Sequence, residues 1–232
     1  MLHLCILIAL VYALQVGVLR LMKLWGPEGN WLKLAIIAQQ TLCILLPVIV
    51  FILIRRLPAR HALGAYEPIW WRMVIAVVAG FFLMIIINLT LPRLIPPSQA
   101  YAESGASIVA YDSLPGLLLT ILAISIVAPL ADELFFRGII LRGLMARCGT
   151  LGAILIVAAL TALFHKLEPL KLTHSFIMGM IFAASVVWTR SVYTSLILHA
   201  VHNSLSLLPQ AWVMGIYGLV MSALGMTGSE NT

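Results

Sequence analysis

The sequence of 232 residues is 62% hydrophobic and only 9% charged, with a mean hydropathy of +1.09. This composition excludes a soluble globular protein, because apolar runs long enough to cross a bilayer core of about 30 Å recur along nearly the whole chain. The net charge of +6 is accounted for by loop residues, and no basic run interleaved with aromatic residues indicates a nucleic-acid partner.

The apolar runs predict an all-α, polytopic membrane protein with about eight transmembrane helices in a single domain over residues 1–232. None of the runs alternates as the strands of a membrane barrel do. The expected spans are 2–22, 31–54, 70–92, 114–147, 150–165, 172–189, 192–208 and 210–226. The first run has no basic n-region and no cleavage site, so we expect it to remain as a span. Residues 95–116 are rich in Pro, Gly and Ser and predict a long loop or a short surface helix.

The charges of the loops predict the orientation of the chain in the membrane. The loop after the second span carries Arg55, Arg56, Arg60 and Arg72, whereas the loop after the third carries Arg93, Glu103 and Asp112. The positive-inside rule therefore places the former in the cytoplasm, with both termini on the same side of a plasma or inner membrane. The basic residues of the first loop, Arg20, Lys23 and Lys33, disagree with this orientation.

A few polar residues lie inside the predicted spans, where ionisable groups are rare and usually mark a substrate path, an ion path or a reaction site. They are Asp132, Glu133 and Arg137 in the fourth span, His165 at the end of the fifth, and His199, His202 and Asn203 in the seventh. These residues are the candidate site.

Helix geometry predicts that these groups meet. If the fourth span turns at Gly149–Thr150 and the fifth returns antiparallel, Glu133 and His165 both stand about 24 Å from the turn. Glu133 and Arg137 are four residues apart and can pair on one helix face. Asp132 is rotated by about 100° from Glu133, so it faces a different partner. Pro129 removes a backbone donor and can bend the helix beside the carboxylates.

Each of these features also has a purely structural interpretation. The carboxylates and Arg137 can be an ion pair that holds helices together, and His165 can cap the end of its helix. His202 can pack between helices as a neighbour of His199. The convergence of carboxylates, a histidine and a His-x-x-x-Asn pair at compatible depths favours a functional site over these separate explanations.

The three motifs resemble the CPBP family of membrane proteases (CAAX proteases and bacteriocin-processing enzymes, also called the Abi family), which includes the type II CAAX prenyl endopeptidases. The family's Glu-Glu-x-x-x-Arg motif is similar to residues 132–138, DELFFRG, and its Phe-x-x-x-His motif is similar to residues 161–165, TALFH. Its His-x-x-x-Asn motif is matched in full by residues 199–203, HAVHN. The resemblance covers residues 114–208.

The resemblance implies a glutamic-type intramembrane endopeptidase that needs no metal or other cofactor and acts on a peptide or a lipidated protein. Carried over by position, Asp132 is the general base, His165 assists it, and His199 and Asn203 stabilise the oxyanion. Glu133 and Arg137 support the site. Asp132 departs from the family's pattern, in which the first residue is Glu, and catalysis is intolerant of a displacement of one ångström. Either the backbone compensates, or Glu133 takes over, or activity is lost.

Two other functions remain open at this point. A non-catalytic relative, such as an immunity or scaffold protein, would bind a peptide or a partner in the same cavity. Alternatively, two histidines and the carboxylates are plausible zinc ligands or parts of a proton path, although no HExxH motif is present. The scattered Cys5, Cys43 and Cys148 argue against a disulfide framework or a thiolate metal site.

Overall fold

In the computed structural model, residues 2–165, 168–205 and 207 are described, and the regular structure of these residues is helical throughout. Three of the helical segments, η1, η2 and η3, have π-helical hydrogen bonding. In chain order the segments are α1 (Leu2–Trp25), α2 (Gly29–Gln40), η1 (Thr41–Leu45), α3 (Leu46–Ile54), α4 (Ala59–Leu63), α5 (Trp70–Leu94), α6 (Gln99–Val109), α7 (Leu114–Thr120), η2 (Ile121–Val127), α8 (Ala128–Asp132), η3 (Glu133–Ile140), α9 (Leu141–Phe164), α10 (Pro169–Thr189) and α11 (Val192–Leu205).

The predicted all-α, polytopic fold is confirmed. Five segments in the described part of the chain are long and apolar enough to cross a membrane. They are Leu2–Trp25, Gly29–Ile54, Trp70–Leu94, Leu114–Phe164 and Pro169–Thr189. The seventh expected span corresponds to the shorter helix α11, and the eighth, 210–226, lies outside the described residues.

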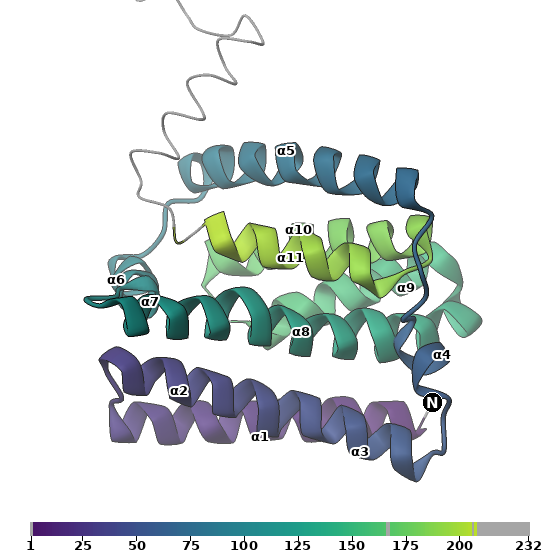
Figure 1. Cartoon of the computed structure of the whole chain (residues 1–232), viewed down its shortest axis with the longest axis horizontal. Helices are drawn as coiled ribbons and strands as arrows, with labels where there is room; N and C mark the ends of the chain where they lie inside the picture. Colours follow the sequence, from purple (N-terminus) through teal and green to yellow (C-terminus); the bar gives the residue numbers. More distant parts are fainter. Residues whose placement is uncertain (1, 166–167, 206, 208–232) are drawn as a thin grey trace, which may run out of the picture.

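The helices form layers around the segment that carries the carboxylates (Figure 1). On one side lies the pair made of α1 and the continuous run α2–η1–α3, and on the other side lies α5. Between them lie the run α7–η2–α8–η3 and the helices α9, α10 and α11. The main apolar core joins α1, η1 and α3 to η3, α9 and α10, so that η3 is buried at its centre.

The predicted hairpin between the fourth and fifth spans is present. Gly149 interrupts α9 with a φ of 70° and a ψ of 176°, a conformation that glycine adopts without a steric penalty. The second arm returns along the first, because the Phe164 ring lies 5.3 Å from that of Phe136 and 5.7 Å from that of Phe135. His165, the next residue, is therefore level with the carboxylates, as the residue count predicts.

The polar stretch 95–116 contains the surface helix α6. The Ser98 hydroxyl caps it by accepting a hydrogen bond from the Tyr101 amide at 3.3 Å, which satisfies one of the free donors at the helix start. The Ser98 amide donates to Glu168 Oε1 at 3.3 Å, so the start of α6 is tied to the start of α10. Both elements lie at the end of the bundle remote from α4 (Figure 1).

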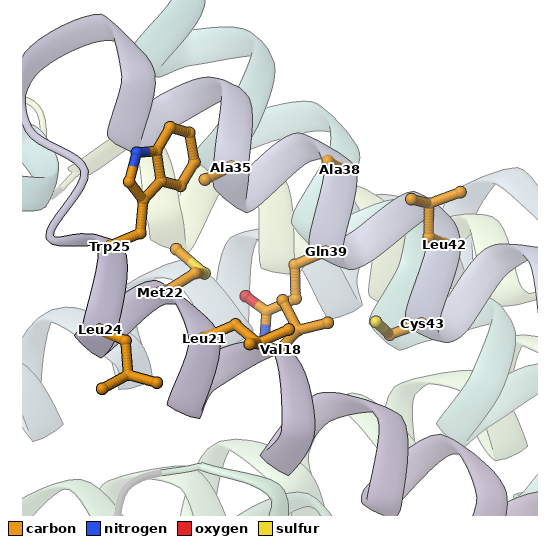
Figure 2. A pocket seen from close by; sticks show the side chains of 10 residues that line it. All are labelled: Val18, Leu21, Met22, Leu24, Trp25, Ala35, Ala38, Gln39, Leu42 and Cys43. Atoms are coloured by element: carbon orange, nitrogen blue, oxygen red, sulfur yellow. The ribbon is translucent and has the colours of Figure 1, made fainter.

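A groove with a volume of about 530 Å³ lies between α1 and the run α2–η1 (Figure 2). Apolar side chains dominate its wall, and the amide of Gln39, which donates to Gln15 Oε1 at 2.8 Å, is its main polar group. None of the candidate site residues lines it. In a membrane such a surface is covered by lipid tails, so we place no reaction there.

Candidate active site

Asp132 and Glu133 lie in the continuous run α7–η2–α8–η3, where the backbone hydrogen-bonding pattern changes at each end of α8. The segment η2 has π-helical bonding, the single turn α8 follows, and π-helical bonding resumes in η3 at Glu133. Pro129 stands at the start of α8 and supplies no backbone N–H. Single π-helical turns are frequent at functional sites because they turn side chains out of the regular α-helical register.

Asn203 supplies a hydrogen-bond donor in place of the backbone N–H that Pro129 lacks. In η2 the Ala128 amide donates to the carbonyl five residues earlier, at Ala123. The same pattern would pair the Ile124 carbonyl with residue 129, which is proline. Asn203 Nδ2 donates to the Ile124 carbonyl at 2.9 Å instead. This bond fixes α11 against η2, the helical segment that precedes the carboxylates.

Glu133 is the centre of the site and is fully buried. Its Oε1 atom accepts from Arg137 Nη1 at 3.2 Å and from His199 Nδ1 at 2.8 Å. Arg137, also fully buried, donates through Nη2 to the Gly179 carbonyl at 3.2 Å. The buried charges are thus paired and hydrogen bonded, which is the condition under which such groups are tolerated away from water. Glu133 Oε2 is buried, and the buried Ser195 hydroxyl also interacts with this carboxylate.

His199 is held in a defined orientation by two contacts. Because a carboxylate accepts, Nδ1 carries the hydrogen that is donated to Glu133, and Nε2 is the other ring nitrogen. The imidazole stacks on the Phe182 ring, with centroids 5.0 Å apart and an interplanar angle of 27°. With Nδ1 bonded to Glu133, Nε2 is the ring nitrogen left for a substrate group.

Asp132 is 8% exposed, whereas Glu133 is completely buried. Its carboxylate forms no ion pair or hydrogen bond within the described residues and interacts electrostatically with His199, Glu133, Arg137 and Lys171. Within the described residues, two side chains therefore hold the Glu133 carboxylate in place, whereas Asp132 has no such bond.

His165 lies at the end of α9, where the backbone leaves the helix. The Thr161 carbonyl accepts a hydrogen bond from Nδ1 at 2.6 Å, so the neutral ring has its lone pair on Nε2. His165 interacts electrostatically with Lys171, His199 and Arg137, three of the groups that also act on Asp132. Over residues 2–165, 168–205 and 207, no hydrogen bond joins His165 to Asp132. The structure thus brings both groups to one region without direct contact.

A second polar cluster adjoins His199, and sequence reasoning named its member His202 but missed Asn88 and His174. His174 Nε2 lies 2.9 Å from Asn88 Oδ1, and the His174 ring stacks on the His202 ring at 5.1 Å. Phe182 contacts both His199 and His202 and so links the two clusters. A polar residue in the apolar run IIINLTL was the available signal for Asn88. Phe182 gave no signal, because an aromatic residue in an apolar helix looks like any other packing residue.

The described part of the chain has no group of three or more His, Cys, Asp or Glu residues arranged to hold a metal ion. His199, the histidine bonded to Glu133, donates a hydrogen bond from Nδ1 and packs one face of its ring on Phe182. The free cysteines Cys5, Cys43 and Cys148 lie in α1, η1 and α9.

Residues 114–205 match the family model described as type II CAAX prenyl endopeptidase Rce1-like. The resemblance to CAAX proteases is confirmed. No curated protein and no solved structure matches the chain significantly. The Rce1-like segment, residues 114–205, contains every side chain of the candidate site and the break at Gly149.

The matched family is a family of membrane proteases, and the Rce1-like segment packs into a multi-helix apolar bundle. The first motif runs from the last residue of α8 into η3, the second ends just after α9, and the third lies on α11. The hairpin at Gly149 and the Glu133–His199 contact bring these segments together. Residues far apart in the Rce1-like sequence therefore share one buried site.

Proposed function

We propose that the chain is an intramembrane endopeptidase that hydrolyses a peptide bond of a membrane-associated or lipidated substrate. The contact of Glu133 with both Arg137 and His199, beside Asp132 and inside the Rce1-like segment, is the observation that carries the proposal. A buried, charge-paired group that orients a histidine next to a second, unengaged carboxylate is typical of a catalytic site.

Asp132 is the proposed general base. It takes a proton from a water molecule while the water oxygen forms a bond to the carbonyl carbon of the peptide. The unengaged carboxylate of Asp132 supports this role, because a general base must be able to reach the proton that it removes. In the alternative, Glu133 is the base, and its Oε2 atom, which does not bind Arg137 or His199, would take the proton.

His165 assists in the proton transfers through Nε2. The Thr161 carbonyl accepts a hydrogen bond from His165 Nδ1–H, so Nε2 is the basic nitrogen of the neutral ring. After the attack, the proton removed from water passes to the nitrogen of the leaving amine and the C–N bond breaks. The products are a carboxylic acid and an amine, and the net reaction consumes one water molecule.

His199 and Asn203 stabilise the oxyanion in this proposal. His199 is oriented by Glu133 and Phe182, with Nε2 as the donor. Asn203 is held in place by the hydrogen bond from its Nδ2 to the Ile124 carbonyl at 2.9 Å. Donors fixed in position before the reaction cost no reorganisation when negative charge develops, and removing one such donor typically lowers kcat by about 10²–10³.

The test is cleavage of a mixed library of prenylated and unprenylated peptides by the purified, detergent-solubilised protein, with products identified by mass. The proposal predicts cleavage that persists with a chelator and is lost in His165→Ala. Loss of cleavage on addition of chelator, with recovery on addition of zinc, would favour a metal enzyme instead.

A second candidate function is a non-catalytic protein that binds a peptide in the same cavity. The observation that favours it is Asp132, which stands where the family pattern has Glu. If the folded wild-type protein binds peptides from the library but cleaves none of them, this function replaces the first.

A further inference from the structure

Two arginine side chains converge on one tyrosine at the end of the bundle that contains α4. The guanidinium carbon of Arg142 lies 5.1 Å from the centroid of the Tyr66 ring, and that of Arg60 lies 5.7 Å from the same centroid. Arg60 belongs to the short helix α4, whereas Arg142 belongs to the first turn of α9. The fold therefore places two cations together that are 82 positions apart in sequence.

Among the described residues, no carboxylate forms an ion pair with Arg60 or Arg142, whereas Glu133 pairs with Arg137 and His199. The Nε atom of Arg142 is buried and has no hydrogen-bond partner. Two like charges on one ring repel each other, and a buried guanidinium donor without an acceptor is costly. An anion beside the two guanidinium groups would offset the repulsion between them.

The backbone around Tyr66 is built to hold this arrangement. Gly64 has a φ of 66°, and a Cβ at this position would lie 2.4 Å from Arg142 Nε, so the Arg142 side chain occupies space that only glycine leaves. The Gly64 carbonyl accepts from the Val192 amide at 3.0 Å, and the Ser191 hydroxyl donates to the Tyr66 carbonyl. The Tyr66 hydroxyl is hydrogen bonded to His61 Nδ1. The loop that contains Gly64 and Tyr66 is thus hydrogen bonded to the start of α11.

A hollow of about 470 Å³ adjoins the pair and is lined by Ala59, Arg60, Leu63, Ala65, Glu67 and Tyr193. Its wall combines a cation with apolar side chains, which suits a molecule with an anionic head and an apolar body. Glu67 is its one acidic lining residue and forms no ion pair with Arg60. Arg55 and Arg56, between α3 and α4, add further positive charge at the same end.

The geometry points to a binding site for the phosphate of an anionic phospholipid between Arg60 and Arg142, beside Tyr66. Planar guanidinium groups bind phosphate oxygens with paired hydrogen bonds. The site lies where the spans end, at the depth of lipid headgroups, and the excess of basic residues predicts that this end faces the anionic cytoplasmic leaflet. The site is separate from the proposed reaction and does not depend on it.

The test uses native mass spectrometry of the whole protein, titrated with phosphatidylglycerol or with phosphatidylcholine that has the same acyl chains. The wild-type protein should bind phosphatidylglycerol about tenfold more tightly than phosphatidylcholine. Arg142→Gln and Arg60→Gln should each remove most of this preference, because a charge-assisted hydrogen bond is typically worth a factor of ten or more.

Arg147→Gln is the matched control, since it removes the same charge from an exposed position of the same helix without touching Tyr66. The preference should survive in this variant. An equal loss in Arg147→Gln and Arg142→Gln would show diffuse attraction and overturn the site. Competition by millimolar inorganic phosphate, with no gain from the lipid tails, would overturn a lipid as the ligand. Because Arg60 is exposed, Arg60→Gln keeps the test valid even if Arg142→Gln does not fold.

Discussion

His199 donates from Nδ1 to Glu133 Oε1 at 2.8 Å, across 66 positions of sequence. The same oxygen accepts from Arg137, so one carboxylate joins the central helix to α11 and neutralises a buried cation. This relationship is the basis of the two different roles that we propose for adjacent carboxylates: Glu133 organises the site, and Asp132 meets the reactants.

Arg137→Leu should destabilise the protein strongly. The change leaves the buried Glu133 carboxylate without its cation, and breaking a buried ion pair on one side typically costs about 3–5 kcal/mol. Thermal unfolding in detergent measures the loss. The double variant Glu133→Gln with Arg137→Leu should be more stable than Arg137→Leu alone, because no unpaired charge remains. A double variant that is less stable than both single variants would contradict this account of the pair.

His165→Ala should lower kcat by about 10²–10⁴ and leave peptide binding almost unchanged, since positioned acid–base groups contribute factors of this size. The measurement is kcat and KM on one cleaved peptide, with Kd obtained separately. His3→Ala, an exposed histidine of α1, is the matched control and should behave like the wild-type protein. A rise in KM at constant kcat would assign His165 to binding instead.

Asn203→Ala should destabilise the protein because it leaves the Ile124 carbonyl without the donor that Pro129 cannot supply. A buried group that loses its partner costs about 1–3 kcal/mol. Pro129→Ala restores an N–H at position 129, so Asn203→Ala should cost less in that background. Unfolding of the four proteins of this cycle measures the coupling. Strictly additive effects would disprove the link between Pro129 and Asn203.

Gly179→Ala should lower both stability and activity. A Cβ at this position would lie 2.8 Å from the Ala158 Cα atom, so α9 and α10 would have to separate. The Gly179 carbonyl that accepts from Arg137 would move with α10. Gly105→Ala in α6 is the control, because a Cβ there meets nothing within 4 Å and alanine favours a helix. Equal unfolding temperatures for both variants would show that the close approach at Gly179 does not matter.

Several of these features could be read from the sequence because they depend on local geometry. Residues four positions apart reach each other on a helix, which predicts the contact between Glu133 and Arg137. Counting residues from a glycine turn predicts that His165 returns to the level of the carboxylates, and the Phe164–Phe136 contact agrees with this.

Other features depend on how separate helices are placed and rotated, which residue patterns do not encode. The pairing of Asn88 with His174 requires α5 to lie beside α10. The partner of Asn203 depends on the π-helical register of η2, which the sequence did not predict although Pro129 was recognised as a missing donor. The orientation of the chain in the membrane, the division into domains and the catalytic roles of the site residues stay predictions.

The central claim is that Asp132 activates the water that cleaves the peptide bond. The most direct test compares wild-type, Asp132→Asn, Asp132→Glu and Glu133→Gln proteins on one cleaved peptide, with folding checked by thermal unfolding. We predict that Asp132→Asn abolishes cleavage while the protein stays folded, and that Asp132→Glu, which restores the residue of the family motif, keeps it. Full activity in Asp132→Asn, with loss only in Glu133→Gln, would contradict the claim and make Glu133 the base.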